Sequence, residues 1–206
     1  RILLPLLAEG FPIEGFDASE EMLEALRARH ARSSSVKPPV WRQFAQHFEA
    51  TKTYALIIVP FGSWGLIVDA QERAQALRSL HKAVAVGGTI VCEIDMVASE
   101  AARAGEVVAY EESCRLSEEE ELHVSMQSLF DAGTSLYRAL SRYTLWRGGL
   151  CVAQEEELFT QYVFTPEIFE RELAAAGFLV VGRYGDYDKK AAEPDAPRVV
   201  YECVRA

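Results

Sequence analysis

The fold is decided by the stretch Ile13-Glu14-Gly15-Phe16-Asp17-Ala18-Ser19-Glu20-Glu21-Met22-Leu23. It predicts a short buried strand over Ile13–Asp17 and a capped amphipathic helix over Glu20–Arg32. Ligands of an open α/β sheet bind beyond the carboxyl ends of its strands, where an acid can accept hydrogen bonds from both hydroxyls of a ribose. Asp17 is therefore our first candidate, as a nucleoside-binding carboxylate. The alternative is that Asp17 only caps the helix, a role that Ser19 fills equally well.

Around this stretch the chain alternates strands and helices. Tyr54–Val59 is a near-continuous apolar run, typical of a strand that is covered on both faces, and Pro60–Trp64 forms a loop at its carboxyl end. The other predicted elements of this half are a helix over Ile2–Glu9, a strand over Val40–Phe44, a helix over Asp69–Ala85 and, after a turn at Gly87-Gly88, a strand over Thr89–Ile94. This order predicts an α/β fold with a parallel, doubly wound sheet.

The pattern changes after Asp95. From Cys114 to Phe164 polar and apolar residues alternate with period two, and Arg147-Gly148-Gly149 is a hairpin turn signal, so this part is predicted to be an antiparallel β insertion. Thr165–Ala176 is again a predicted helix, and Phe178–Tyr184 and Arg198–Arg205 are the last predicted strands. We therefore divide the chain into an α/β core over residues 1–96, the insertion over 97–163 and the end of the core over 164–206.

Composition limits the partners. The net charge of −10 argues against nucleic acid, because binding phosphates requires clustered Lys and Arg. No apolar run approaches the roughly 20 residues that cross a bilayer, which argues against a membrane partner, and Arg1–Leu7 lacks the cleavage site of a signal peptide. The four cysteines are widely spaced and predict unpaired thiols in a reducing cytoplasm. The histidines lack the spacing of metal ligands, so we expect no metal site.

The succession of these pieces resembles a class I S-adenosylmethionine-dependent methyltransferase of the small-molecule type. The motifs that carry the resemblance are Gly15–Leu23, Tyr54–Val59 with Pro60-Phe61, Val86–Thr89, Phe164–Glu167 with Ala175–Phe178, and Gly185–Asp188. The resemblance implies a Rossmann-like sheet with an antiparallel final hairpin, and a β insertion that covers substrate and can build a dimer. It also implies S-adenosylmethionine as cofactor and S-adenosylhomocysteine as product. The cofactor-binding residues that it implies are Asp17, Ala18, Met22, Phe44, Ala45 and Pro60.

The sequence departs from the family pattern at three places. The family's first strand and its glycine-rich loop are missing from this chain, because Arg1–Leu4 looks like the helix that follows that loop. We expect roughly 40 further residues upstream, and exposed apolar surface where the central strand is missing. Gln43–Ala45 stands where the family often has an acid for the adenine, although Phe44 can pack on that ring. Ala55 stands where the fourth strand usually carries an acid.

Methyl transfer from a sulfonium needs alignment and exclusion of water more than a particular base, so we assign no catalytic residue. An amine acceptor needs only to be neutral, whereas a hydroxyl needs a base, and His81 is a weak candidate for one. We expect Glu93 and Asp95 to point to opposite sides, with one of them entering the cleft to attract an amine. The substrate-side candidates are Phe61, Ser63, Trp64 and Glu93. Purely structural alternatives exist as well: Ser63 can be a turn residue, Trp64 can be part of the core, and the acids can lie in an exposed loop.

Three functions stay open. The first is a methyltransferase that acts on nitrogen or oxygen of a small molecule. The second is a non-catalytic, dimeric binding module on the same fold, because fold alone does not establish function. The third, which the antiparallel final hairpin disfavours, is an enzyme that uses a nucleotide sugar or a dinucleotide.

Overall fold

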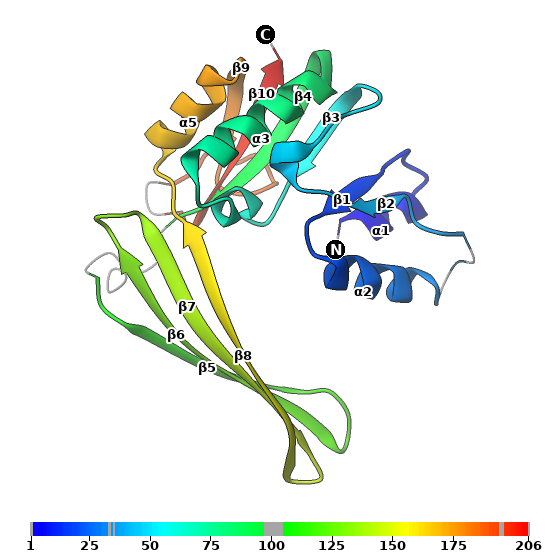
Figure 1. Ribbon diagram of the computed structural model, residues 1–206, viewed down its shortest axis with the longest axis vertical. Helices are drawn as coiled ribbons and strands as arrows, with labels where there is room; N and C mark the ends of the chain where they lie inside the picture. Colours follow the sequence, from blue (N-terminus) through cyan, green and yellow to red (C-terminus); the bar gives the residue numbers. More distant parts are fainter. Residues whose placement is uncertain (1, 33, 35, 97–104, 194–195, 206) are drawn as a thin grey trace.

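The computed structural model describes residues 2–32, 34, 36–96, 105–193 and 196–205. The strands form three sheets, and Figure 1 shows one of them extending away from the other two. The core contains a two-stranded sheet of β1 (Gly15–Asp17) and β2 (Val40–Arg42), and a four-stranded sheet in the order β3 (Tyr54–Val59), β4 (Val84–Asp95), β10 (Arg198–Arg205) and β9 (Phe178–Tyr184). The extended sheet, which we call the arm, consists of β5 (Val108–Arg115), β6 (Glu120–Asp131), β7 (Leu136–Arg147) and β8 (Leu150–Tyr162).

The core has the predicted topology. β1 pairs with β2 and β3 pairs with β4 in parallel, whereas β10 runs antiparallel to both β4 and β9. One prediction about β4 was wrong: the strand begins at Val84 and includes the Gly87-Gly88 pair, where Gly87 has a φ of +72°. The register between β3 and β4 shifts at this point, so the glycines form an irregularity within the strand.

Polar caps set the starts of the longer helices. Ser19 caps α2 (Glu20–His30), Asp69 caps α3 (Ala70–Ala83) and Thr165 caps α5 (Pro166–Ala175), each by accepting a backbone N–H of the first turn. The short elements are α1 (Leu3–Ala8) and the 3-10 turns η1 (Ala45–His47) and η2 (Ser63–Leu66). α3 and α5 cover one face of the four-stranded sheet (Figure 1). The apolar residues between them are almost fully buried, for example Leu77, Phe169 and Tyr201.

The two core sheets are separate. In the described part of the chain, no strand pairs with the second edge of β1 or of β3, and Leu56 on β3 is 51% exposed. Exposed apolar surface was expected at this place. Side chains connect the two sheets. The ring of Phe16 on β1 lies 4.8 Å from that of Phe48, which follows η1 and belongs to the buried core, and the Tyr54 hydroxyl donates to Glu14. Since Glu14 and Tyr54 stand at the beginnings of β1 and β3, the amino ends of these strands meet.

The arm is a meander of four antiparallel strands. Its β7–β8 hairpin turns at Gly148 and Gly149, which have φ values of +57° and +79°, a conformation that glycine adopts without strain. The first arm strand begins at Val108, earlier than the period-two pattern predicted. The predicted lower boundary of the insertion, residue 97, lies outside the described residues. At the other end β8 leads directly into α5 (Figure 1).

Candidate functional site

Asp17 ends β1 at the carboxyl edge of its sheet. Its Oδ1 accepts a hydrogen bond from the Ser19 backbone N–H at 3.0 Å, while Ser19 itself is the helix cap, with its Oγ accepting from Met22 N–H at 3.1 Å. Ser19, and not Asp17, is therefore the residue that caps α2. Among the described residues, Oδ2 of Asp17 has no donor, and the side chain is exposed. One oxygen thus fixes the carboxylate and the other is available to a ligand.

Exposed apolar side chains follow three parallel strands at their carboxyl ends. Met22 lies after β1, Phe44 after β2 and Phe61 after β3, and they are 61%, 44% and 45% exposed. Arg42 Nε donates to the Ala18 carbonyl at 3.1 Å and so fixes the loop after β1. Such surfaces suit a flat, apolar ring. Ala45 differs from these residues, because it packs against the core.

The loop after β3 has an unusual backbone. Phe61 has a φ of +57°, and Gly62 follows with +61°. A bulky residue in the left-handed region stores strain, and such residues concentrate at functional sites. Pro60 opens the loop, and its carbonyl accepts from Ser63 Oγ at 2.7 Å, which makes Ser63 a turn residue. Trp64 is 1% exposed and contacts the ring of Phe169, so it forms a wall of the core and not a platform for substrate.

A second acid lies against this loop. Asp95 ends β4, and its Oδ2 accepts a hydrogen bond from Gln161 Nε2 of β8 at 2.8 Å. A Cβ at Gly62 would lie 1.9 Å from this Oδ2, and one at Gly65 would lie 2.4 Å from Gln161 Cγ. The two glycines therefore allow the loop to close onto the Asp95–Gln161 pair. The sequence indicated Asp95, but it gave no signal for Gln161, because no pattern links the arm to this edge.

Glu93 is deeply buried on the same strand. It is 2% exposed, accepts a hydrogen bond from the Tyr187 hydroxyl at 2.7 Å and lies 3.8 Å from Arg198. Burial and the bond to Glu93 raise the pKa of Tyr187 above its ordinary value. These contacts occupy the carboxylate and do not support direct contact with a substrate. The expectation that Glu93 and Asp95 point to opposite sides was wrong, because strand positions two apart share a face.

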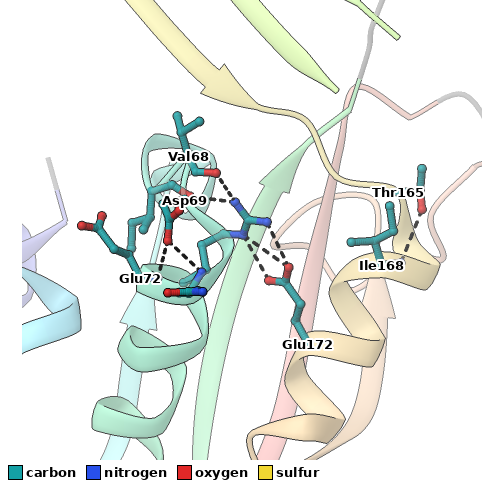
Figure 2. A network of polar contacts seen from close by, with 9 residues as sticks. Val68, Asp69, Glu72, Thr165, Ile168 and Glu172 are labelled. Carbon is teal, nitrogen blue, oxygen red and sulfur yellow. Dashed lines mark hydrogen bonds and ion pairs between the residues drawn. The ribbon is translucent and has the colours of Figure 1, made fainter. Parts of the chain in front are cut away.

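A buried cation joins the arm to the core. Arg73 of α3 is 3% exposed; it donates to Glu172 of α5 at 3.1 Å and to the Val68 carbonyl at 2.7 Å (Figure 2). Its guanidinium also lies 4.1 Å from the centre of the Tyr162 ring, at the end of β8. The same side chain therefore contacts both core helices, the loop before α3 and the last residue of the arm. Figure 2 shows how the capped first turns of α3 and α5 frame this contact.

Two histidines lie away from the site. His81 sits at the end of α3, at the amino edge of the sheet, where its ring meets Phe178 edge-on at 5.1 Å. Burial and then the nearby Arg205 lower its pKa. It is therefore not positioned as a base for chemistry at the opposite edge. His123 pairs with Thr144 far along the arm, well removed from Gln161.

The sequence matches no protein-family profile and no curated protein. The fold, in contrast, matches solved structures. A S-adenosylmethionine-dependent methyltransferase from Clostridium acetobutylicum superposes with a TM-score of 0.82 at 17% identity, over 98% of this chain and 78% of the other. The CcbJ methyltransferase from Streptomyces caelestis superposes with a TM-score of 0.78 at 18% sequence identity, over 100% of this chain and 84% of the other. A sugar N-methyltransferase from a Streptoalloteichus species superposes with a TM-score of 0.71 at 21% sequence identity, over 98% of this chain and 74% of the other.

At these identities the likeness shows the fold. The chain thus has the Rossmann-like fold of S-adenosylmethionine-dependent methyltransferases, as the sequence predicted. Its antiparallel final hairpin and its β insertion were predicted as well. None of the helices in the described ranges is long and apolar enough to span a bilayer.

Proposed function

We propose that this protein transfers the methyl group of S-adenosylmethionine to a nitrogen or oxygen atom of a small molecule. The observation that carries the proposal is Asp17, fixed at the end of β1 with one carboxylate oxygen free, in a chain that has the methyltransferase fold over 98% of its length. A free carboxylate oxygen beside exposed apolar side chains suits a ligand that combines a ribose with a flat ring.

Each side chain has a distinct task in this proposal. Asp17 binds the ribose hydroxyls, Met22 and Phe44 enclose the adenine, and the backbones of Ala18, Ala45 and Pro60 border the cofactor. When bound, S-adenosylmethionine supplies an activated methyl group on a sulfonium. Phe61 lies in the strained loop after β3, where it shields the reacting atoms from water, and Ser63 holds the turn of that loop.

Several structures with this fold carry names that point to acceptors. They include a sugar N-methyltransferase, an amino pentose methyltransferase and a glycopeptide N-methyltransferase. A small polar acceptor, bound between the loop after β3 and the root of the arm, is consistent with this group. We therefore place the acceptor at that junction.

Calorimetric titration with S-adenosylmethionine and S-adenosylhomocysteine tests the proposal. We expect micromolar binding in the wild type and a loss of about tenfold or more in Asp17→Ala, since a charge-assisted hydrogen bond contributes about 1.5–3 kcal/mol. Glu24→Ala, which removes an exposed acid from the same region, is the matched control and keeps its affinity. Absence of binding by the folded, intact protein would contradict the proposal and favour a non-catalytic binding module.

We further propose that the arm forms a homodimer. Leu140 and Leu158 are paired neighbours on one arm face, 44% and 70% exposed, and Leu129 lies on the same face at 41%. An apolar cluster of this kind on a sheet is typical of an interaction surface. A second copy offers a self-complementary partner for it. Leu158→Glu is expected to give monomers in sedimentation velocity, whereas Leu179→Glu, on the exposed side of β9, leaves the dimer intact.

We also propose a reducing, cytoplasmic location. All four cysteines are free, and Cys114 and Cys151 are exposed on the arm. Exposed free thiols persist in a reducing compartment and oxidise outside it. Fractionation of cells with antibody detection tests this location, and recovery of the chain from a secreted fraction would contradict it.

A further inference from the structure

Asp95 differs from other acids of the core in its surroundings. Its carboxylate lies where three segments converge: the end of β4, the loop after β3 and the end of β8. Of its two oxygens, Oδ2 accepts from Gln161 at 2.8 Å, and Oδ1 has no donor in the described ranges. The half-buried carboxylate therefore has an oxygen with unused hydrogen-bonding capacity at the proposed acceptor site.

Asp95 forms no ion pair with a described residue. Among described residues no Lys, Arg or His lies within ion-pair distance of this carboxylate, and its hydrogen-bond partner is a neutral amide. Arg198 stands directly opposite Asp95 on β10, but its guanidinium lies 3.8 Å from the carboxylate of Glu93. Removing a carboxylate from water without a counter-charge is costly, so a bound cation would be favoured at this position.

The protein holds this carboxylate at a cost to its own backbone. The loop that covers it contains Phe61 at a φ of +57° beside Gly62 at +61°. The absence of a side chain at Gly62 lets the loop backbone contact Asp95 directly, and Gly65 does the same for Gln161. The strained backbone at Phe61 and the close contacts at Gly62 and Gly65 together fix the orientation of the Asp95 carboxylate.

We infer that Asp95 is the group that selects a cationic, amine-bearing acceptor, and that Gln161 of the arm positions it. The inference rests on the proposed function and narrows it from nitrogen or oxygen to an amine. Oδ1 accepts a hydrogen bond from the ammonium form of the acceptor as it binds. The ammonium then loses one proton to water, and the neutral nitrogen attacks the methyl group, with S-adenosylhomocysteine as the leaving group. Gln161 belongs to β8, whose next residue, Tyr162, packs on Arg73, so the seating of the arm on the core sets the orientation of Asp95.

Matched pairs of amines and alcohols test this inference on the intact protein. The probes are glucosamine against glucose and benzylamine against benzyl alcohol, and NMR titration in the presence of S-adenosylhomocysteine gives their dissociation constants. We expect the wild type to bind each amine about tenfold more tightly than its neutral partner. Asp95→Asn should abolish this preference, and Gln161→Leu should reduce it about threefold. Glu24→Gln, an isosteric change of an exposed acid, is the control that keeps it.

The outcomes are separable. The affinity of each variant for S-adenosylhomocysteine is measured by calorimetry, and we expect it to stay within about twofold of the wild type. If S-adenosylhomocysteine binds but amines and alcohols bind equally to the wild type, or Asp95→Asn retains the preference, the inference on Asp95 is overturned while the proposed function stands. If S-adenosylhomocysteine fails to bind the folded wild type, the proposed function is overturned, and the inference with it.

Discussion

The guanidinium of Arg73 meets the carboxylate of Glu172 at 3.1 Å, although 99 residues separate them in the sequence. The arginine is 3% exposed, and its guanidinium also lies over the Tyr162 ring, 4.1 Å from the ring centre. α3, α5 and the last strand of the arm therefore share one contact. The whole arm lies between these two charged residues in the sequence. Their ion pair therefore connects the part of the core that precedes the arm with the part that follows it.

Arg73→Met should destabilise the protein by about 3 kcal/mol, because it leaves Glu172 without its cation and frees the Ile67 and Val68 carbonyls. Urea unfolding followed by circular dichroism measures the change. Lys190→Met is the control, since it removes an exposed ion pair with Asp188 and should cost less than about 1 kcal/mol. Equal losses in the free energy of unfolding for the two variants would show that the buried Arg73–Glu172 pair stabilises the protein no more than an exposed ion pair.

Gly62→Ala should cost more than replacement of a glycine at an open turn. Both Gly62 and Gly10 have positive φ, so alanine at either position pays about 1 kcal/mol for the backbone conformation. Only at Gly62 does the new Cβ meet an atom, Asp95 Oδ2 at 1.9 Å, whereas nothing lies within 4 Å at Gly10. Thermal melting should show the larger loss for Gly62→Ala. Similar melting temperatures for both variants would contradict the close packing of the loop on Asp95.

The Tyr54–Glu14 hydrogen bond should make stability depend on pH at both extremes. Burial and then the bond to Glu14 raise the pKa of Tyr54 to about 12, so the stabilisation from its protonated form is complete below the unfolded pKa near 10 and is lost as the pH rises toward 12. The bonds from Tyr54 and Lys52 lower the pKa of Glu14, so its contribution is present above its unfolded pKa and is lost as the pH falls through the lowered folded value.

Tyr54→Phe removes the bond and should weaken both dependences. The measurement is the free energy of unfolding in urea across pH 3 to 11, compared between variant and wild type. A constant difference across this range would show that the hydrogen bond does not control the titration of either group.

The four cysteines should react as two pairs of different accessibility. Burial raises the pKa of the Cys203 thiol to about 12 and raises that of Cys92 further, while Cys114 and Cys151 are exposed. A disulfide reagent at pH 8 should therefore modify two thiols in the native protein and all four in denaturant. Rapid modification of all four under native conditions would contradict the buried core of β4 and β10.

The sequence by itself determined the local elements and their order. Apolar runs of strand length marked β3, β9 and β10 to the residue, because β-branched and aromatic residues favour strands. Caps such as Asp69 and Thr165 fixed where helices begin, since they act on backbone groups only a few residues away.

Only the tertiary structure decided which of the acids near the end of β4 faces the site. Glu93 is buried under Tyr187 from the loop before β10, and Asp95 is held by Gln161 from the arm. These partners come from segments at least 66 residues away in sequence, and a side chain's environment at such separations depends on the fold as a whole. The burial of Trp64 and the contacts of Arg73 were decided in the same way, because packing between distant elements leaves no periodic pattern in the sequence.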